Sequence, residues 1–315
     1  MTARESSRPL VVLTGPTGTG KTEIALALAG ELPLEIVSVD SAQVYRGLDI
    51  GSAKPSAEVR ARVPHHLIDL VEPAESYSAG QFVRDAARAI DDIETRGRVP
   101  LLVGGTMLYL RSLIGGIAVL PEGNAEVRAG IDADAARQGW PALHARLAAV
   151  DPAAAARIHP NDAQRIQRAL EVHAVTGQPI SELQAATASP LRRVFHVMAL
   201  IPGDRARLHA ALERRFAQMM AEGFLDEVRS LYARGDLTEA HAAIRAVGYR
   251  QLWAHLAGSY SLEIAVDRAV AATRQLAKRQ MTWLRSMSNI RVFDPHDAQR
   301  LVGIRESLLG AVSLL

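Results

Sequence analysis

The chain has 315 residues, of which 48% are hydrophobic and 22% charged, and its formal net charge is +2. This composition is typical of a globular protein with one large domain or two modest ones. The absence of cysteine excludes disulfides, thiolate catalysis and Cys-ligated zinc. No apolar run is long enough to span a membrane, and the N-terminus MTARESSRPL lacks the apolar stretch of a signal peptide, so we expect a cytoplasmic protein with no membrane partner.

Strands and helices alternate in the first third of the chain. Short apolar runs that end at Gly, Asp or Leu predict strands over residues 9–15, 35–40, 66–70 and 99–105. Helices are expected over residues 21–32 and from a capping box at Ser78 and Gln81 to about Arg96, before Gly97. Such alternation indicates a parallel sheet with right-handed crossovers.

From residue 112 the pattern becomes rich in Ala, Arg and Gln and predicts only helices, one of them over 164–175 after a cap at Asn161–Asp162 and before Gly177. Strand character returns at 194–201, Asp204 can cap a long helix, and a helix over 262–287 precedes a strand over 290–293. We therefore expect a P-loop NTPase-like α/β core from residues 1–111 and 193–315, with an all-helical insertion domain over residues 112–192.

A glycine-rich loop lies between the first strand and the first helix. Its residues match G-x-x-x-x-G-K-[ST] in full and in the expected context: Gly15, Pro16, Thr17, Gly18, Thr19, Gly20, Lys21 and Thr22. Backbone N–H groups of such a loop and the following helix N-terminus attract phosphate oxygens. Lys21 would neutralise the phosphate, and the Thr22 hydroxyl would bind Mg²⁺.

The loop predicts a polyphosphate ligand without saying which one. There is no N-K-x-D guanine signature and no apolar strand that ends in a Walker B aspartate beside a catalytic glutamate. A small-molecule kinase or NTPase therefore has no support beyond the loop. Only three residues are lysines, Lys21, Lys54 and Lys278, and all three lie in candidate motifs.

Two polar segments follow predicted strands at the edge of the sheet where ligands bind in open α/β folds. Asp40 can serve there as a general base or metal partner, or as the cap of the next turn. Gly104, Gly105 and Thr106 follow another strand, where Thr106 can contact a ligand or cap a helix.

Basic residues cluster in three places. Arg274, Lys278 and Arg285 share a helical face, with Arg279 and Trp283 nearby. The segments 164–168 and 245–250 carry further arginines, and Tyr249 in the second is expected to be available for stacking on a base. Each cluster alone is typical of a solvated helix face, but three of them beside a phosphate loop favour a nucleic-acid partner.

The motifs taken together resemble those of the tRNA dimethylallyltransferase family, also called tRNA isopentenyltransferases. The resemblance extends over nearly the whole chain, through GPTGTGKT (15–22), SVDSAQVYRGLDIGSAKP (38–55), PHHLIDL (64–70), VGGTMLYLRSL (103–113), ARIHPNDAQRIQRALEV (156–172), RRFAQMMAEGFLDEV (214–228), AIRAVGYRQLW (243–253) and TRQLAKRQMTWLR (273–285). It implies transfer of a dimethylallyl group from dimethylallyl diphosphate to N6 of adenosine 37, next to the tRNA anticodon.

The resemblance also implies site roles. The loop would bind dimethylallyl diphosphate with Mg²⁺, and Asp40 would take the N6 proton. Thr106 would donate a hydrogen bond near the leaving diphosphate, Arg215 would bind the diphosphate, and Lys21 would neutralise its charge. The helical insertion would bind the anticodon stem-loop, and a monomer is expected. The residues implied in tRNA contact are Asp40, Ser41, Ala42, Gln43, Thr106, Arg128, Gln164, Arg165, Ile166, Gln167, Arg168, Arg245, Ala246, Val247, Gly248, Tyr249, Arg250, Lys278, Arg279, Gln280, Met281, Thr282, Trp283, Leu284 and Arg285.

Three other function classes make different predictions. A P-loop kinase would turn over ATP and have no need of residues 112–190. A non-catalytic RNA-binding module would leave the intact phosphate loop without a role. A prenyltransferase acting on free adenine nucleotides would share the core chemistry, but the insertion and the basic clusters argue against it.

Overall fold

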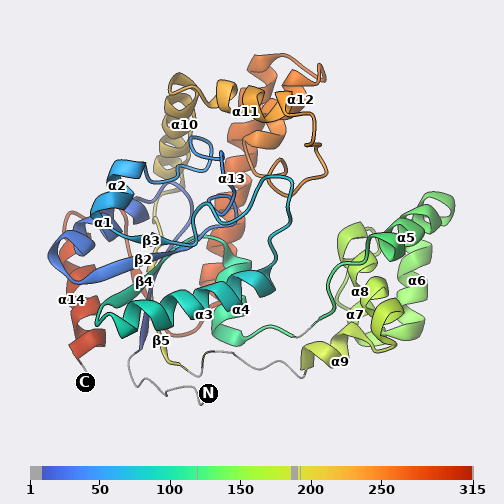
Figure 1. Cartoon of the computed structure of the whole chain (residues 1–315), viewed down its shortest axis with the longest axis horizontal. Coiled ribbons are helices and arrows are strands. Elements are labelled where there is room, and N and C mark those ends of the chain that lie inside the picture. Colours follow the sequence, from blue (N-terminus) through green and yellow to red (C-terminus); the bar gives the residue numbers. More distant parts are fainter. Residues whose placement is uncertain (1–8, 119, 186–190, 192, 314–315) are drawn as a thin grey trace. The chain divides into compact units, whose positions relative to one another are not determined.

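The computed structural model describes residues 9–118, 120–185, 191 and 193–313. The chain divides into two compact units, Met1–Ile114 with Leu191–Leu315, and Gly115–Pro190 (Figure 1). The divisions expected from sequence were at residues 112 and 192. Within the described residues, no helix combines the length and the apolar character needed to cross a membrane.

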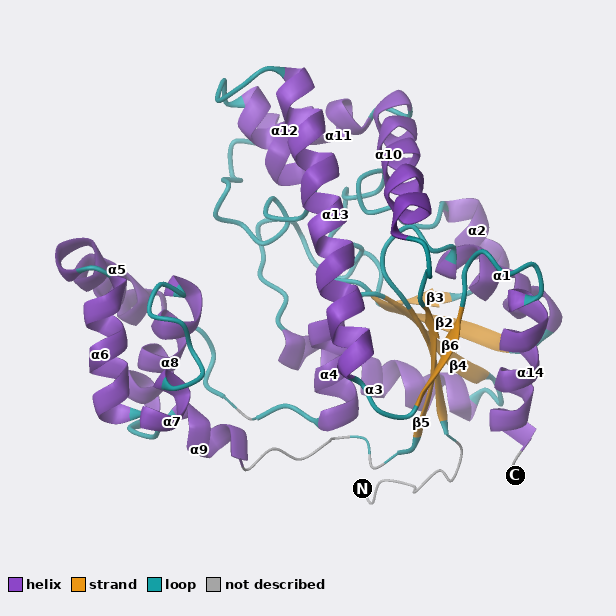
Figure 2. Cartoon of the chain, turned by 180° about the vertical axis from the view of Figure 1, so that it is seen from behind, coloured by secondary structure: helices purple, strands orange, loops and turns teal. Residues whose placement is uncertain are grey.

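The first unit contains a six-stranded parallel sheet in the order β3-β2-β4-β1-β5-β6 (Figure 2). Its strands are β1 (Leu10–Thr14), β2 (Leu34–Val39), β3 (His65–His66), β4 (Val99–Gly104), β5 (Phe195–Leu200) and β6 (Ile290–Phe293). The predicted parallel α/β sheet is thus confirmed. β1 is fully buried, as expected for a short continuous apolar run at the centre of such a sheet.

The helices of this unit are α1 (Lys21–Glu31), α2 (Ala57–Arg62), α3 (Ala79–Thr95), α4 (Met107–Gly115), α10 (Arg205–Ala221), α11 (Phe224–Ala233), α12 (Tyr249–Leu256), α13 (Leu262–Ser286) and α14 (Arg300–Ser313), and some of them cover the two faces of the sheet. Apolar residues of α1 and α14 pack on one face, and α3 contacts β2 and β4 while α4 and α13 contact β5. Helix α14 was not expected from the sequence.

Two predicted helix caps are present. At the start of α3, the Gln81 N–H donates to Ser78 Oγ over 3.2 Å and the Ser78 N–H donates to Gln81 Oε1 over 2.7 Å, which is a complete capping box. At the start of α10, Asp204 Oδ1 accepts from the N–H groups of Ala206 and Arg207.

The strand predicted over residues 66–70 was wrong beyond His66. Leu67 and Asp69 have positive φ, which a strand does not allow. The chain turns instead to pair with the loop after β2, where Leu70 N–H donates to Val44 O over 2.8 Å. Asp69 is drawn into ion pairs with Lys54 and Arg60 at 2.6 and 2.7 Å, which hold this turn.

A second apolar core lies among the helices α10 to α13 and the loop that follows β2. Its buried residues include Tyr45 and Leu48 from the loop, Phe216 from α10, Phe224 from α11 and Tyr249 from α12. This core packs the loop that follows β2 against the helices α10 to α13. The loop and these helices lie over the carboxyl ends of the strands.

The second unit is entirely helical over its described residues. It comprises α5 (Ala125–Gln138), α6 (Trp140–Val150), α7 (Pro152–Ala155), α8 (Ala163–Thr176) and α9 (Ile180–Ala185) around a separate apolar core. Asp162 caps α8 and Gly177 ends it with φ 72°, as predicted.

Candidate active site

The register of the sheet brings three chain segments to one edge. Gly104 pairs with Val39 on one side and with Thr14 on the other, so β1, β2 and β4 end together. The residues that follow, Gly15, Asp40 and Gly105, therefore lie at that edge. A Cβ on Gly104 would lie 2.2 Å from Val39 O, so only glycine allows the strands to come this close.

The phosphate loop connects β1 to α1 and is stabilised by its own side chains. Thr19 Oγ1 and Lys21 Nζ both donate to Pro16 O, over 2.9 and 2.8 Å. Gly18 and Gly20 have φ of 80° and 78°, in the left-handed region that favours glycine. The loop thus has the open shape in which backbone N–H groups and the N-terminus of α1 can receive an anion.

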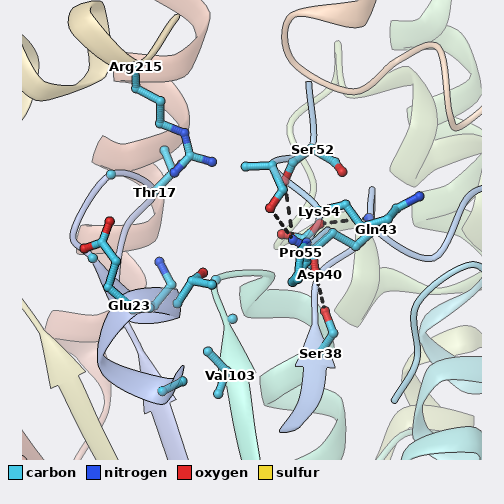
Figure 3. A pocket seen from close by; sticks show the side chains of 18 of the residues that line it. Thr17, Glu23, Ser38, Asp40, Gln43, Ser52, Lys54, Pro55, Val103 and Arg215 are labelled. Atoms are coloured by element: carbon cyan, nitrogen blue, oxygen red, sulfur yellow. Dashed lines mark hydrogen bonds between the residues drawn. The ribbon is translucent and has the colours of Figure 1, made fainter. Parts of the chain in front are cut away.

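A hollow of about 700 Å³, here called the loop hollow, opens above this loop; its lining includes Gly18, Lys21, Thr22, Asp40, Arg215 and Met219. Figure 3 shows Arg215 and Glu23 on one side of the loop hollow and Ser52, Gln43 and Lys54 on the other. The predicted phosphate-binding residues are therefore joined by Arg215, which comes from the distant helix α10.

Two half-buried cations, Lys21 and Arg215, line the loop hollow. Burial, followed by repulsion from Arg215, lowers the pKa of Lys21 to about 7, although the Asp40 carboxylate opposes this shift. Burial also lowers the pKa of Arg215. Two cations whose charges disfavour each other in one hollow indicate a site for an anion, which would relieve that repulsion.

Lys54, the other lysine of the loop hollow, is already saturated. Its side chain is 2% exposed, and Nζ donates to Tyr45 O, Asp49 Oδ1 and Asp69 Oδ1 at 2.8, 2.6 and 2.6 Å. An ammonium has three donors, so Lys54 supports the loop after β2 and has none left for a ligand.

Asp40 is oriented by the turn that it begins. Its Oδ1 accepts from the N–H groups of Ala42 and Gln43, at 2.8 and 3.3 Å. The capping role and the functional role weighed from sequence therefore coexist, because one carboxylate oxygen is used by the turn. Thr106 lies beside this turn, where its Oγ1 accepts from the Ser41 N–H over 3.0 Å.

A second hollow of about 430 Å³, here called the edge hollow, lies on the other side of Asp40; its lining includes Ser41, Thr106, Phe216, Arg245, Arg279 and Trp283. The residues that line both hollows are Thr17, Asp40, Ser52, Gly105, Arg215, Met219 and Gln280. Asp40 thus lines both hollows, which share Arg215, and the edge hollow adds Trp283, Arg245 and Arg279.

Glu227 was not identified from the sequence, yet it holds a wall of both hollows. Its carboxylate accepts from the N–H groups of Asp49, Ile50 and Gly51, at 3.0, 2.7 and 3.2 Å, and from Tyr249 Oη at 2.5 Å. The same loop binds Gln43 Nε2 through the carbonyls of residues 52 and 53. No local pattern predicts this contact, because α11 and the loop are far apart in sequence.

The position of Tyr249 differs from the one expected from the sequence. The side chain is completely buried, its ring packs edge-on against Phe224, and its hydroxyl donates to Glu227. Burial raises the pKa of Tyr249, and the Glu227 carboxylate adds to the shift. The expectation that this ring is available for stacking on a base was wrong, because the second core takes it up.

The predicted basic segment of α13 splits into two faces. Lys278, Arg279, Thr282, Trp283 and Arg285 are exposed, whereas Gln280, Met281 and Leu284 are buried. The guanidinium of Arg111 stacks over Trp283, 5.0 Å from its ring centroid. In the segment 245–250, Arg245 and Arg250 are exposed, Ala246 and Val247 are half-buried, and Gly248 is buried.

In the helical unit, a buried carboxylate gathers two of the predicted arginines. Glu171 accepts from Arg128 Nε over 2.8 Å, from Arg168 over 2.7 Å and from the Asn124 N–H over 2.7 Å. Burial alone would raise the pKa of Glu171, but hydrogen bonds from the two arginines lower it.

Other predicted residues of the helical unit differ in exposure. Gln164 and Arg165 are exposed, and Ile166 is buried. Gln167 donates to Asp132 over 2.6 Å.

Oxygen ligands in the loop hollow fit a magnesium ion. The Thr22 hydroxyl and the Asp40 carboxylate both line it, and Mg²⁺ prefers such oxygens. Among the residues described by the structure, no group of three or more His, Asp and Glu side chains is placed to hold a metal by itself. A magnesium ion here would take its remaining ligands from phosphate oxygens and water, as is usual for Mg²⁺.

Comparisons with known proteins agree with this geometry. The family model described as IPP transferase matches residues 43–287, and that described as Isopentenyl transferase matches residues 9–67. A tRNA dimethylallyltransferase of Bordetella petrii is 56% identical over 294 residues, with 92% of this chain and 93% of the relative covered. One of Paraburkholderia phymatum is 57% identical over 295 residues, with the same coverage.

Solved structures extend the likeness to three dimensions. A tRNA isopentenylpyrophosphate transferase of Bacillus halodurans matches with a TM-score of 0.71 at 37% identity, over 98% of this chain and 97% of that one. A eukaryotic dimethylallyltransferase acting on tRNA matches with a TM-score of 0.81 at 27% identity, over 96% and 80% of the two chains.

Proposed function

The chain belongs to the IPP transferase family, and we propose that it transfers a dimethylallyl group from dimethylallyl diphosphate to N6 of adenosine 37 in tRNA. The products are N6-(dimethylallyl)adenosine and diphosphate. The observation that carries this proposal is the position of Asp40, which lines both the loop hollow and the edge hollow. A donor in one and an acceptor in the other would meet at its carboxylate.

The loop hollow suits the leaving group. As the allylic C–O bond breaks, its electron pair goes to the diphosphate, and negative charge builds on that group. Lys21, Arg215 and the loop N–H groups are positioned to stabilise this charge, which is commonly the largest catalytic contribution. Mg²⁺, bound through Thr22 and phosphate oxygens, would neutralise further charge on the diphosphate when present.

The edge hollow suits a base that has left its stack. Trp283 offers an exposed aromatic surface, and Arg279 adds positive charge. The N6 lone pair forms the new bond to the allylic carbon, and the N6 proton goes to the Asp40 carboxylate. An exocyclic aromatic amine is a weak nucleophile, so a base at this position aids the transfer.

The rest of the tRNA would follow the exposed cations. Lys278, Arg279 and Arg285 on α13 and Arg245 beside α12 are exposed in the core unit, and the helical unit would bind the anticodon stem-loop. Because one chain supplies the lining of both hollows, we expect a monomer to suffice, and we expect it to act on tRNA in the cytoplasm.

One experiment tests the proposal against its competitors. The protein is incubated with unmodified tRNA, Mg²⁺ and dimethylallyl diphosphate, and diphosphate release and prenylated nucleoside are measured. We expect one diphosphate for each prenylated adenosine. Prenylation of free adenine nucleotide but not of tRNA, or phosphate transfer from ATP without prenylation, would overturn the proposal.

A further inference from the structure

Gln280 connects two segments of the active site through a single side chain. It lies on α13 and is 7% exposed. Its Oε1 accepts from the Thr17 N–H of the phosphate loop over 3.0 Å, and its Nε2 donates to Gly105 O after β4 over 2.8 Å. The orientation of the amide is unambiguous, because one partner can only donate and the other can only accept.

The surroundings of Gln280 are built closely around it. A Cβ on Gly105 would lie 2.7 Å from Gln280 Nε2 and 3.0 Å from Gly15 O. The absence of a side chain at residue 105 is therefore what lets the amide approach the end of β4. The next residue, Thr106, accepts a hydrogen bond from the Ser41 N–H beside Asp40. The contact of Gln280 with Gly105 is therefore one residue away from a residue that contacts the turn of Asp40.

The same helix carries the exposed cations. Ala277, Gln280, Met281 and Leu284 recur at the helical spacing of one face and are buried, while Lys278, Arg279 and Trp283 point away from it. Gln280 lines the edge hollow together with Arg279 and Trp283, but unlike them its side chain is buried. Its two hydrogen bonds account for this burial.

We propose that Gln280 is a positioning residue of the diphosphate site, which ties the phosphate loop and the end of β4 to the helix that bears the basic face. The proposal rests on the proposed function for the identity of the donor, but not for the anion-binding role of the loop. The side chain, which lines both hollows, acts through its hydrogen bonds to Thr17 and Gly105. Its loss leaves the Thr17 N–H and Gly105 O without their partner, so the loop loses its ordered shape.

The first test measures binding of inorganic diphosphate with Mg²⁺ by calorimetry, which requires no transfer reaction. Gln280→Met keeps the size of the side chain and removes both hydrogen bonds. We expect diphosphate affinity to fall about tenfold, with tRNA affinity unchanged. Gln275→Met is the matched control, because Gln275 is exposed on the same helix. Unchanged diphosphate affinity together with weakened tRNA binding would overturn the proposal and make Gln280 a tRNA contact.

The second test uses pH and stays informative if Gln280→Met folds poorly. Glu at this position accepts from the Thr17 N–H in either protonation state, but only a protonated carboxyl can donate to Gly105 O. Burial and the facing carbonyl raise the pKa of such a carboxyl. The diphosphate affinity of Gln280→Glu, taken as a ratio to wild type, should therefore recover as the pH falls. A ratio independent of pH would contradict the bridging role. If both tests succeed but wild type prenylates no tRNA, the proposed function fails while the positioning role stands.

Discussion

At the scale of single residues, the site separates groups that can act on a ligand from groups that are already committed. Lys21 and Arg215 line the loop hollow and can interact with a ligand there. The Lys54 ammonium already donates to three acceptors and has no N–H left for a ligand. Asp40 combines both conditions, since one oxygen orients the turn that follows it. These differences depend on contacts that residue type alone does not reveal.

Replacing Asp40 by Asn separates its two roles. Asn keeps an oxygen that can accept from the Ala42 N–H, so the turn should persist, but it cannot take the N6 proton. We expect single-turnover prenylation to slow by about 10²-fold or more, while tRNA affinity in a filter-binding assay changes little. Asp91→Asn, at an exposed position on α3, is the control. Loss of tRNA binding in Asp40→Asn would instead assign Asp40 a recognition role.

The pKa of Lys21, lowered to about 7, predicts proton uptake on diphosphate binding. At pH 8 most of the free protein has a neutral Lys21, and the bound anion favours the charged form, so a proton is taken up. At pH 6 the amine is already charged and little uptake remains. Calorimetry in buffers of different ionisation enthalpy should show up to about one more proton taken up at pH 8 than in Lys21→Met. Equal uptake in the two proteins would show that Lys21 does not titrate with binding.

At the scale of elements, the loop after β2 owes its shape to helices that come much later in the chain. Glu227 of α11 receives three consecutive backbone N–H groups of residues 49–51, and Tyr249 of α12 binds the same carboxylate. The second apolar core brings these helices over the loop. The shape of this wall of the site therefore depends on the packing of the helices α11 and α12.

Glu227→Gln tests that dependence. The amide of Gln keeps one acceptor oxygen, but its NH₂ group cannot accept, so two of the four donors lose their acceptor and the other two bonds weaken. The free energy of unfolding should therefore fall by about 2 kcal/mol. Tyr249→Phe removes only one of these bonds and should cost about 1 kcal/mol. Urea denaturation followed by circular dichroism measures both. Costs in the reverse order would show that the tyrosine, not the carboxylate, holds the loop.

At the scale of the whole molecule, the two units have separate cores and separate buried charges. The helical unit encloses Glu171 with Arg128 and Arg168, none of which lines the loop hollow. The core unit contains both hollows. Binding of the donor and binding of the anticodon stem-loop should accordingly respond to different substitutions.

Glu171→Ala tests this division. It removes a buried carboxylate from Arg128 and Arg168, whose side chains are 44% and 30% exposed and can be rehydrated, so the loss of the hydrogen bonds should cost about 2 kcal/mol. We expect the helical unit to unfold at lower urea and tRNA affinity to fall, while diphosphate affinity stays at the wild-type value. Glu126→Ala, at an exposed position on α5, is the control. A matching loss of diphosphate affinity would show that the units do not act separately.

Features that depend on neighbours along the chain could be predicted from the amino-acid sequence. The phosphate loop, five of the six strands, the caps at Ser78, Asp162 and Asp204 and the family resemblance all follow from short motifs and periodicity. The strand predicted over residues 66–70 is the exception. Asp69 forms ion pairs with Lys54 and Arg60, which hold this segment in a turn outside the sheet.

Which side chains at the site remain available to a ligand depends on contacts that form only in the folded molecule. The tertiary structure placed Gln280 inward, buried Tyr249, saturated Lys54 and brought Glu227 to a loop about 180 residues earlier in the chain. Helical spacing shows which residues share a face, but not whether that face meets solvent or a neighbouring element. Hydrogen bonds between distant segments are set by packing, so they become visible only once the core has formed.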